Sequence, residues 1–331
     1  MTKAGQPEAE QPEAGQNAGT IIVGGENLID FVEHTVVDGI PQYSANPGGS
    51  PYNVAIAAAR QHANVDYITP ISNDRLGKLL SERLTASGVR HNAPVLDDPT
   101  SLAVVSLEQG QPTYQFYRNG TAERLITRGH LDNVLGQSPW LFHIGSLALS
   151  GGDDAALWED FFIACHNKGV VTSLDPNVRP RLIEDRAVYL PRLEKLFQYA
   201  DIIKLSDEDI AWLYPDMTMD QAFDHLVALS CPGLRVLTIG AEGARAISGE
   251  EKVNIAAHPV QQLVDTVGAG DTFMASILVW CADHGIVSAA EFNALSSKNL
   301  HNMMAYAAKA AALNCEQQGC NPPVKEALAH D

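Results

Sequence analysis

A glycine-rich stretch near the C-terminus carries the residue types in this sequence that are best suited to chemistry. Residues 265–273 read Asp-Thr-Val-Gly-Ala-Gly-Asp-Thr-Phe, and an apolar run of helical length follows them. Glycines let a backbone approach a ligand without interference from a Cβ atom. The free N–H groups of Gly268, Ala269 and Gly270 would then lie at a helix N-terminus, where donors and the helix dipole together bind anions. Asp271 falls in the same first turn, where a carboxylate either acts on a ligand or is a plain helix-start residue.

This string resembles the C-terminal signature of the ribokinase-like (PfkB) family of carbohydrate kinases. The resemblance implies that Asp271 is the catalytic base and that the amides of residues 268–270 form an anion hole for the transferred phosphoryl group. It also implies ATP and Mg²⁺ as cofactors. A monovalent cation is a further expectation from the family, near Asp265 and the loop around Gly319.

Two further segments resemble the sugar-binding elements of the family. Residues 47–55 read Pro-Gly-Gly-Ser-Pro-Tyr-Asn-Val-Ala, and the resemblance implies that Gly49 and Asn53 meet substrate hydroxyls. A Gly-Gly pair before a helix is also explained by a tight turn alone. Asp30 follows the first predicted strand and matches a family aspartate that accepts hydrogen bonds from the sugar, although an aspartate there is also a common turn residue.

Two arginines are candidate substrate ligands. Arg118 lies in Phe-Tyr-Arg-Asn-Gly-Thr-Ala, residues 116–122, which resembles a segment of fructokinases where an arginine faces the sugar. A solvated charge at a strand end explains Arg118 equally well. Arg179 lies in Asp-Pro-Asn-Val-Arg-Pro, residues 175–180, which matches a DPNxR element of the family and follows a predicted buried strand. Open α/β sheets place ligands at such carboxyl ends, so Arg179 is expected to hold substrate or phosphate.

A second group of residues is expected on the nucleotide side. Ser206 and Asp209 have the spacing of a helix N-cap, which alone accounts for them. The resemblance adds that Lys204 and Ser206 lie near the nucleotide phosphates, and that Asp209 lies near the Mg²⁺ ion through water. Many family members carry Asn and Glu where this chain has Ser206 and Asp209, so the carboxylate that organises the metal stays open.

The remaining nucleotide contacts are expected from a turn and from the last helix. Thr238, Gly240 and Gly243 match a turn that lines the nucleotide pocket in this family, although such a turn is also common in hairpins. Asn302 matches a position near the adenine. The apolar stripe that follows it is typical of a helix face buried in a core.

Short apolar runs alternate with helical patterns along the chain, which predicts an α/β fold with a mainly parallel central sheet flanked by helices. The predicted strands are residues 20–23, 67–71, 141–144, 170–174, 202–205 and 236–239. The predicted helices are residues 53–61, 76–87, 155–167, 190–199, 221–228, 269–283 and 302–313. The resemblance identifies this arrangement as the ribokinase-like fold.

One stretch departs from the alternation. Residues 101–107 and 113–118 have strand patterns around a Gly-containing turn, which indicates a hairpin. With residues 32–45 it is expected to form a small β lid beside the main sheet. We therefore expect one kinase domain over residues 20–331, with lid segments near 32–45 and 101–118, and a disordered tail over residues 1–19, which lack apolar side chains beyond Met1.

Composition excludes several classes of function. The 331 residues hold 40 acidic and 22 basic side chains, a formal net charge of −18, which disfavours nucleic acid and anionic membranes as partners. No apolar run is long enough to span a bilayer. The five cysteines have no CxxC spacing, so neither a disulfide framework nor a zinc site is supported. We expect a cytoplasmic protein. We also expect the lid hairpin to offer an exposed strand edge at which two copies associate as a homodimer.

Together these observations predict ATP-dependent phosphorylation of a sugar hydroxyl, with fructose as the expected sugar. A 2-keto-3-deoxygluconate kinase, a ribokinase or a nucleoside kinase would use the same scaffold. The alternative from another class is a non-catalytic, regulatory sugar-binding protein. The presence of Asp271 and the glycine-rich amides argues against it.

Overall fold

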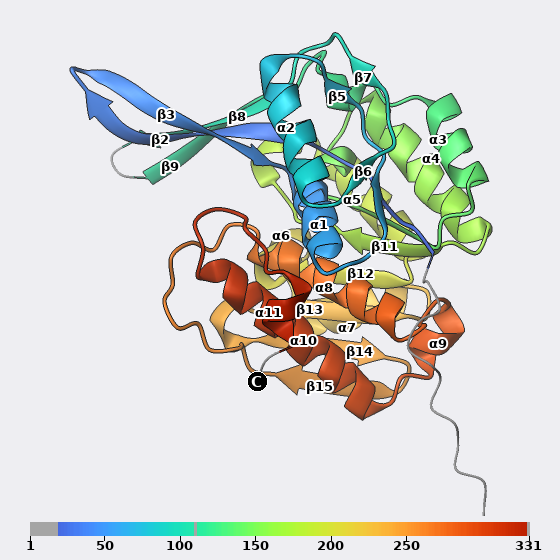
Figure 1. Cartoon of the computed structure of the whole chain (residues 1–331). Helices are drawn as coiled ribbons and strands as arrows, with labels where there is room; N and C mark the ends of the chain where they lie inside the picture. The colour runs from blue at the N-terminus through green and yellow to red at the C-terminus, as the bar shows by residue number, and fades with distance from the viewer. Residues whose placement is uncertain (1–18, 109–110, 330–331) are drawn as a thin grey trace, which may run out of the picture.

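The computed structural model describes residues 19–108 and 111–329 and is built around a nine-stranded sheet (Figure 1). The strand order is β15-β14-β13-β12-β11-β10-β1-β4-β6, parallel from β6 to β13, with β14 and β15 antiparallel. Its strands are β1 (Ile21–Val23), β4 (Val65–Tyr67), β6 (Arg90–His91), β10 (Leu141–Gly145), β11 (Val171–Asp175), β12 (Ile202–Ser206), β13 (Leu234–Thr238), β14 (Ala244–Ser248) and β15 (Glu251–Ile255). Of the predicted disordered tail, residues 1–18 lie outside the described residues.

The central strands are buried on both faces because helices cover both sides of the sheet. Side chains alternate between faces along a strand, so Ile21 and Val23 join one hydrophobic cluster and Ile22 joins the other. This two-sided burial explains why these strands are continuous runs of Ile, Val and Leu.

The two clusters divide the helices into two layers. One face is packed by α1 (Ser50–Arg60), α2 (Arg75–Ala86), α8 (Ala269–Asp283), α9 (Ala289–Asn293) and α10 (Ser297–Cys315). The other is packed by α3 (Arg128–Gly136), α4 (Asp153–Asn167), α5 (Arg186–Phe197), α6 (Asp207–Leu213) and α7 (Met219–Leu229). A last short helix, α11, covers Lys325–Leu328.

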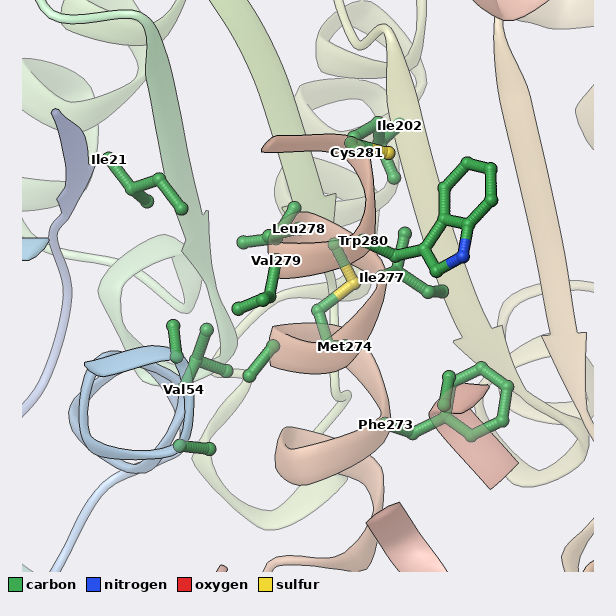
Figure 2. Packing of buried hydrophobic residues seen from close by; sticks show 14 of the residues in the cluster. Ile21, Val54, Ile202, Phe273, Met274, Ile277, Leu278, Val279, Trp280 and Cys281 are labelled. Atoms are coloured by element: carbon green, nitrogen blue, oxygen red, sulfur yellow. The ribbon is translucent and has the colours of Figure 1, made fainter. Parts of the chain in front are cut away.

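Helix α8 is the central helix of its layer. Its residues from Asp271 to Cys281 are buried, and it packs between α1 and α10. Figure 2 shows Leu278 and Val279 on the side of α8 where Val54 of α1 lies, and Met274 belongs to the same hydrophobic cluster. From Asp271 onward the helix is therefore held on several sides by packed side chains.

A second, four-stranded sheet projects from the body of the molecule (Figure 1). Its order is β3-β2-β8-β9, from strands β2 (Leu28–Val37), β3 (Ile40–Gly48), β8 (Ser101–Glu108) and β9 (Gln111–Tyr117). The segments expected to form a lid, 32–45 and 101–118, therefore lie largely in one sheet. We call this sheet the lid. The short strands β5 (Ile71–Ser72) and β7 (Val95–Leu96) form a separate two-stranded parallel sheet.

Most of the predicted helices and strands lie close to the observed ones, although the helices predicted to begin at residues 190 and 302 begin at Arg186 and Ser297. The helix predicted over 269–283 has these bounds, and the helices predicted over 155–167 and 53–61 begin only two or three residues earlier than expected. The strand predicted over 67–71 is wrong. Pro70 lacks the N–H that a ladder requires, and the chain leaves β4 at Tyr67 and enters a different sheet at Ile71.

Two further observations bear on the compositional arguments. Within the described ranges, no helix has the length and apolar character needed to cross a bilayer. All five cysteines are free thiols.

Candidate active site

A large open cavity of about 1890 Å³ lies between the main sheet and the lid. Segments that follow β1, β11, β12 and β13 line it, so it opens at the carboxyl edge of the parallel strands. The chain runs from β1 outward to β6 and then returns to β10 on the other side of β1, which makes this edge a topological switch point. From the lid, alternate residues of β2 (Leu28, Asp30, Val32 and His34) face the cavity.

Asp271 is a buried carboxylate at the wall of this cavity. Its Oδ1 accepts a hydrogen bond from the Ser50 hydroxyl at 2.7 Å, and its Oδ2 accepts one from Asn53 Nδ2 at 2.8 Å. Burial raises the pKa of Asp271, and the two hydrogen bonds together with the charges of Lys204 and Arg179 only partly offset that rise. Asp271 is therefore oriented by α1 and has enhanced basicity.

The amide donors expected beside Asp271 lie at the N-terminus of α8. Gly268 is the N-cap in a left-handed conformation, φ 77°, and a Cβ atom there would collide with Cys320. The amides of Gly268 and Gly270 have no protein acceptor in the described part of the chain. Ala269 differs from the expectation, because its N–H donates to Thr266 O at 3.2 Å within the turn. Two of the three expected donors therefore remain available to an anion.

Lys204 brings a positive charge to the same turn. Its ammonium group donates to Asp175 Oδ2 at 2.7 Å, with both side chains almost fully buried. The ammonium lies 3.6 Å from the place that a Cβ atom on Gly270 would occupy. Burial alone would lower the pKa of Lys204, but the carboxylates of Asp175, Asp209 and Asp271 hold it above its ordinary value. The ammonium therefore stays charged at the mouth of the amide turn.

Four of the five expected sugar-side residues, Asp30, Gly49, Asn53 and Arg179, also line the cavity. Burial raises the pKa of Asp30 to about 6, which the positive charge of Arg179 partly counteracts. Gly49 has φ 115° at the start of α1, and a Cβ atom on it would collide with the backbone oxygen of Glu26. Asn53 Oδ1 is buried with no hydrogen-bond partner among the described residues, so it is free to accept from a ligand. Arg179 is exposed at the cavity wall, where its guanidinium donates to Asn177 Oδ1 at 2.6 Å.

The acidic run after β12 forms the capping box that its spacing predicts. Ser206 accepts from the Asp209 amide at 3.1 Å, and Asp209 Oδ2 accepts from the Ser206 amide at 2.9 Å. Asp209 Oδ1 also accepts from the Val178 amide at 2.6 Å. Both oxygens of Asp209 are thus engaged by the backbone, although Asp209 lines the cavity together with Asp207 and Glu208.

The donor set fits a weakly protein-bound Mg²⁺ ion. No group of three or more His, Cys, Asp or Glu side chains within residues 19–108 and 111–329 is arranged to hold a metal. Magnesium in kinase sites usually keeps several waters and takes one or two carboxylates plus substrate phosphates. The carboxylates of residues 207–209 at the cavity wall suit that arrangement.

The turn after β13 lies at the cavity as expected. Thr238, Gly240 and Gly243 all line it. Gly243 has φ 109°, and a Cβ atom there would collide with the backbone oxygen of Ile255. This position therefore requires glycine for both conformational and steric reasons.

Two expected site residues lie elsewhere. Arg118 is absent from the residues lining the large cavity, because its guanidinium is buried in an ion pair with Glu123 at 2.9 Å and a bond to Leu147 O at 3.3 Å. Asn302 is exposed in the second turn of α10, whereas the α10 residues that line the cavity begin at Ala308. Since a helix rises 1.5 Å per residue, about 9 Å of helix separates Asn302 from the cavity wall.

The sequence interpretation missed two groups at the site. Glu26 is buried at the cavity wall and accepts from the Ser50 amide. Arg83 of α2 donates to Pro47 O at 3.1 Å and to Cys320 O, which joins the segment before α1 to the C-terminal loop. Glu26 could have been found from its position. It is an acidic residue three positions after the first strand, at the edge of the sheet where ligands bind.

The two segments expected to form a monovalent-cation site, around Asp265 and around Gly319, are in contact. Asp265 Oδ2 accepts from the Gly319 amide at 2.9 Å, and Asp265 Oδ1 accepts from the Val267 amide at 3.0 Å. The two segments named from the sequence are therefore held together by Asp265, beside the N-terminus of α8.

Comparisons with known proteins extend over nearly the whole chain. A family model described as pfkB family carbohydrate kinase matches residues 20–327. A fructokinase of Rhizobium leguminosarum bv. trifolii is 34% identical over 283 residues, covering 85% of this chain and 86% of that protein. Fructokinase-1 of Oryza sativa subsp. japonica is 31% identical over 264 residues, covering 77% and 80%. A crystal structure of a fructokinase with bound ATP from Xylella fastidiosa superposes with a TM-score of 0.85 at 25% identity, over 94% of this chain and 97% of that one.

Proposed function

The chain belongs to the pfkB family of carbohydrate kinases, and we propose that it transfers the γ-phosphoryl group of ATP to a hydroxyl group of fructose. The predicted ribokinase-like α/β fold is confirmed by the match to a solved kinase structure. The choice of fructose draws on the named fructokinases among the relatives. ATP is proposed because a structural neighbour is described with it.

One observation carries the mechanism. The Asp271 carboxylate is fixed by Ser50 and Asn53 in the first turn of α8, whose Gly268 and Gly270 amides are free to bind an anion. A base and an anion site thus share one helical turn at the wall of the cavity. Phosphoryl transfer depends on positioning and on charge stabilisation, and this pair would supply both.

In the proposed reaction, Asp271 accepts the proton of the sugar hydroxyl while the hydroxyl oxygen attacks the γ-phosphorus. The new O–P bond forms as the bond from the γ-phosphorus to the bridging oxygen breaks, and ADP leaves. The amides of Gly268 and Gly270 and the ammonium of Lys204 offset the negative charge on the transferred group. The raised pKa of Asp271 favours its role as base, because a catalytic pKa closer to the working pH is more effective.

A bound Mg²⁺ ion would neutralise phosphate charge in this site. We assign its coordination to water bridges from residues 207–209, because both oxygens of Asp209 already accept backbone N–H groups. A monovalent cation is proposed beside Asp265 and the Gly319 loop, which the structure holds in contact.

The sugar is proposed to lie under the lid, against Asp30, Asn53 and Arg179. The unpartnered Asn53 Oδ1 supports a hydroxyl contact, and Gly49 supports close approach of the backbone. Asp30 is an acceptor for further hydroxyls. Residues of β2 above the cavity would exclude water, which otherwise competes as the acceptor of the phosphoryl group.

We further propose a cytoplasmic homodimer that associates through the lid. Free thiols at all five cysteines suit a reducing compartment. On the lid, Val36, Val37 and Ile40 are more than half exposed, and β3 and β9 are edge strands. Exposed apolar side chains beside a free strand edge favour association with a second copy.

The base assignment is tested with Asp271→Asn. The amide is nearly isosteric but cannot accept the hydroxyl proton, so kcat should fall by at least about 100-fold. Dissociation constants for sugar and ATP, measured by calorimetry, should change by less than about tenfold. Asp283→Asn is the matched control, since Asp283 lies on the same helix but is paired with Lys325 at its far end. Retention of more than about a tenth of wild-type kcat in Asp271→Asn would remove Asp271 from the role of base.

The substrate assignment needs a separate assay. ADP release is followed with fructose, ribose, adenosine and 2-keto-3-deoxygluconate at equal concentration. Fructose should give the highest kcat/KM. A tenfold preference for any of the other three would replace fructose, whereas sugar binding without ADP release would favour the non-catalytic alternative.

A further inference from the structure

The strongest unassigned feature of the site is Glu26, in the four-residue segment that joins β1 to β2. Its side chain is 1% exposed, yet it lies at the wall of the cavity. Glu26 Oε1 accepts from the Ser50 amide at 3.0 Å. Ser50 in turn donates its hydroxyl to Asp271 Oδ1 at 2.7 Å. Two consecutive hydrogen bonds therefore connect Glu26 to the proposed base.

We propose that Glu26 is a positioning residue that acts through Ser50 to orient the Asp271 carboxylate for proton transfer. The proposal rests on the proposed function, because it assumes that Asp271 is the base. Glu26 does not touch the reacting atoms in this account. Its part is to fix the first residue of α1, from which the Ser50 hydroxyl reaches Asp271.

The local backbone explains why such an anchor matters. Ser50 follows Gly49, whose φ of 115° is a conformation open chiefly to glycine. The N-cap residue, Gly49, has no side chain that could accept from the amides of the first turn of α1. The amide of Ser50 is thus held by Glu26 alone, and without that acceptor the first turn would be free to shift. A shift of 1 Å at a catalytic group costs on the order of 100-fold in rate.

The surroundings of Glu26 disfavour its charged form. Burial raises the pKa of Glu26 to about 7, against attraction from Arg118 and with some repulsion from Glu123. The phenol of Tyr67 also lies within its electrostatic reach. Glu26 Oε2 has no hydrogen-bond partner among the described residues. The ionised form of Glu26 binds the Ser50 amide more strongly than the neutral form does, but both forms offer an acceptor oxygen.

The test compares variants that keep or remove the acceptor in the full chain. Glu26→Met removes it, and kcat should fall by about 10- to 100-fold while the dissociation constants of fructose and ATP stay within threefold. Glu26→Gln retains an acceptor oxygen and should restore most of the lost kcat. Glu26→Asp keeps the charge but shortens the side chain, so it should lose kcat in the same way as Glu26→Met. It also serves as the second variant if thermal melting shows that Glu26→Met does not fold.

A double-mutant cycle separates action through Ser50 from an independent effect. Ser50→Ala removes the hydroxyl that orients Asp271. If Glu26 acts through Ser50, the kcat of the Glu26→Asp, Ser50→Ala double variant should lie within threefold of the kcat of the less active single variant. Multiplicative losses in the double variant would overturn the proposal. So would wild-type kcat in Glu26→Asp, or a fructose dissociation constant that rises as much as kcat falls, which would make Glu26 a substrate contact.

Asp271→Asn is measured in the same series so that the two ideas can fail separately. Loss of kcat in Asp271→Asn with no effect of Glu26→Asp refutes the positioning role alone. Retained kcat in Asp271→Asn refutes the proposed base.

Discussion

At the scale of single residues, the site is a set of carboxyl groups whose environments differ. Burial raises the pKa of Asp271, while hydrogen bonds from Ser50 and Asn53 keep its carboxylate oriented. Asp209 is also buried, but its oxygens serve as acceptors for two backbone amides. The two aspartates therefore differ in role. Asp271 is oriented by side chains of α1, whereas Asp209 caps the N-terminus of α6.

Asp30 gives a prediction about pH. Burial raises its pKa to about 6, so the carboxylate is mostly protonated below that pH and ionised above it. The ionised form accepts hydrogen bonds from sugar hydroxyls more strongly. The affinity for fructose should therefore rise as the pH increases from 5 to 7, with a midpoint near the pKa of Asp30.

Calorimetric titration with fructose across this range measures the effect. Asp30→Asn should bind more weakly at pH 7, by about tenfold, and should lose the pH dependence. Asp38→Asn, in the turn between β2 and β3, is the control on the exposed tip of the lid. A pH dependence that survives in Asp30→Asn would assign the titration to another group.

At the scale of elements, the anion site depends on how the N-terminus of α8 meets the C-terminal loop. Gly268 leaves room for Cys320, and Asp265 accepts the amide of Gly319. Arg83 ties Cys320 O to Pro47 O and so joins this loop to the segment before α1. Three separate stretches of chain are held together around one helical turn.

The two ends of α8 allow a matched comparison of glycine substitutions. Gly268 and Gly285 both have positive φ, 77° and 66°, but only at Gly268 would a Cβ atom meet neighbouring atoms. Gly285→Ala should cost about 1 to 2 kcal/mol of folding free energy from backbone strain, with little change in kcat. Gly268→Ala adds a collision with Cys320 and should lower kcat by at least about tenfold.

Chemical denaturation and the ADP-release assay measure the two quantities. Equal kcat values in the two variants would show that the packing of Cys320 on Gly268 is unimportant for the anion site. A larger loss of kcat in Gly285→Ala would contradict the placement of the active site at the N-terminal end of the helix.

At the scale of the whole molecule, the lid is a sheet that projects away from the two main hydrophobic clusters. β2 begins buried at Leu28 and β3 ends buried at Gly48, but Val36, Val37 and Ile40 at the other end of this strand pair are exposed to solvent. Figure 1 shows this sheet extending away from the body of the molecule. A second copy packed on the lid would bury these side chains and stiffen the sheet over the cavity.

Sedimentation velocity tests the dimer. The wild-type chain should sediment as a dimer, and a Val37→Glu, Ile40→Glu double variant should sediment as a monomer, because two buried unpaired charges are strongly unfavourable. Val188→Glu, at an exposed position of α5, should leave the dimer intact. A monomeric wild type, or a dimer that survives the double variant, would exclude association through the lid.

The sequence alone determined the features that depend on neighbouring residues. Helix 269–283 was predicted with its observed bounds, because a glycine-rich start, an apolar run and a His-Gly stop are all local signals. The capping box of Ser206 and Asp209 is equally local. The family and the kinase reaction class followed from one continuous string of residues around Asp271, which the comparisons bear out.

Only the tertiary structure decided what meets Asp271 and which candidates reach the cavity. Ser50 and Asn53 contact Asp271 across more than 200 residues of chain, and no local pattern encodes such a contact. From the sequence, Arg118 could be either a sugar ligand or a solvated charge. In the structure it forms a buried ion pair with Glu123 instead. Burial, which only the packed fold establishes, is also what raises the pKa of Glu26 and sets this carboxylate beside the site.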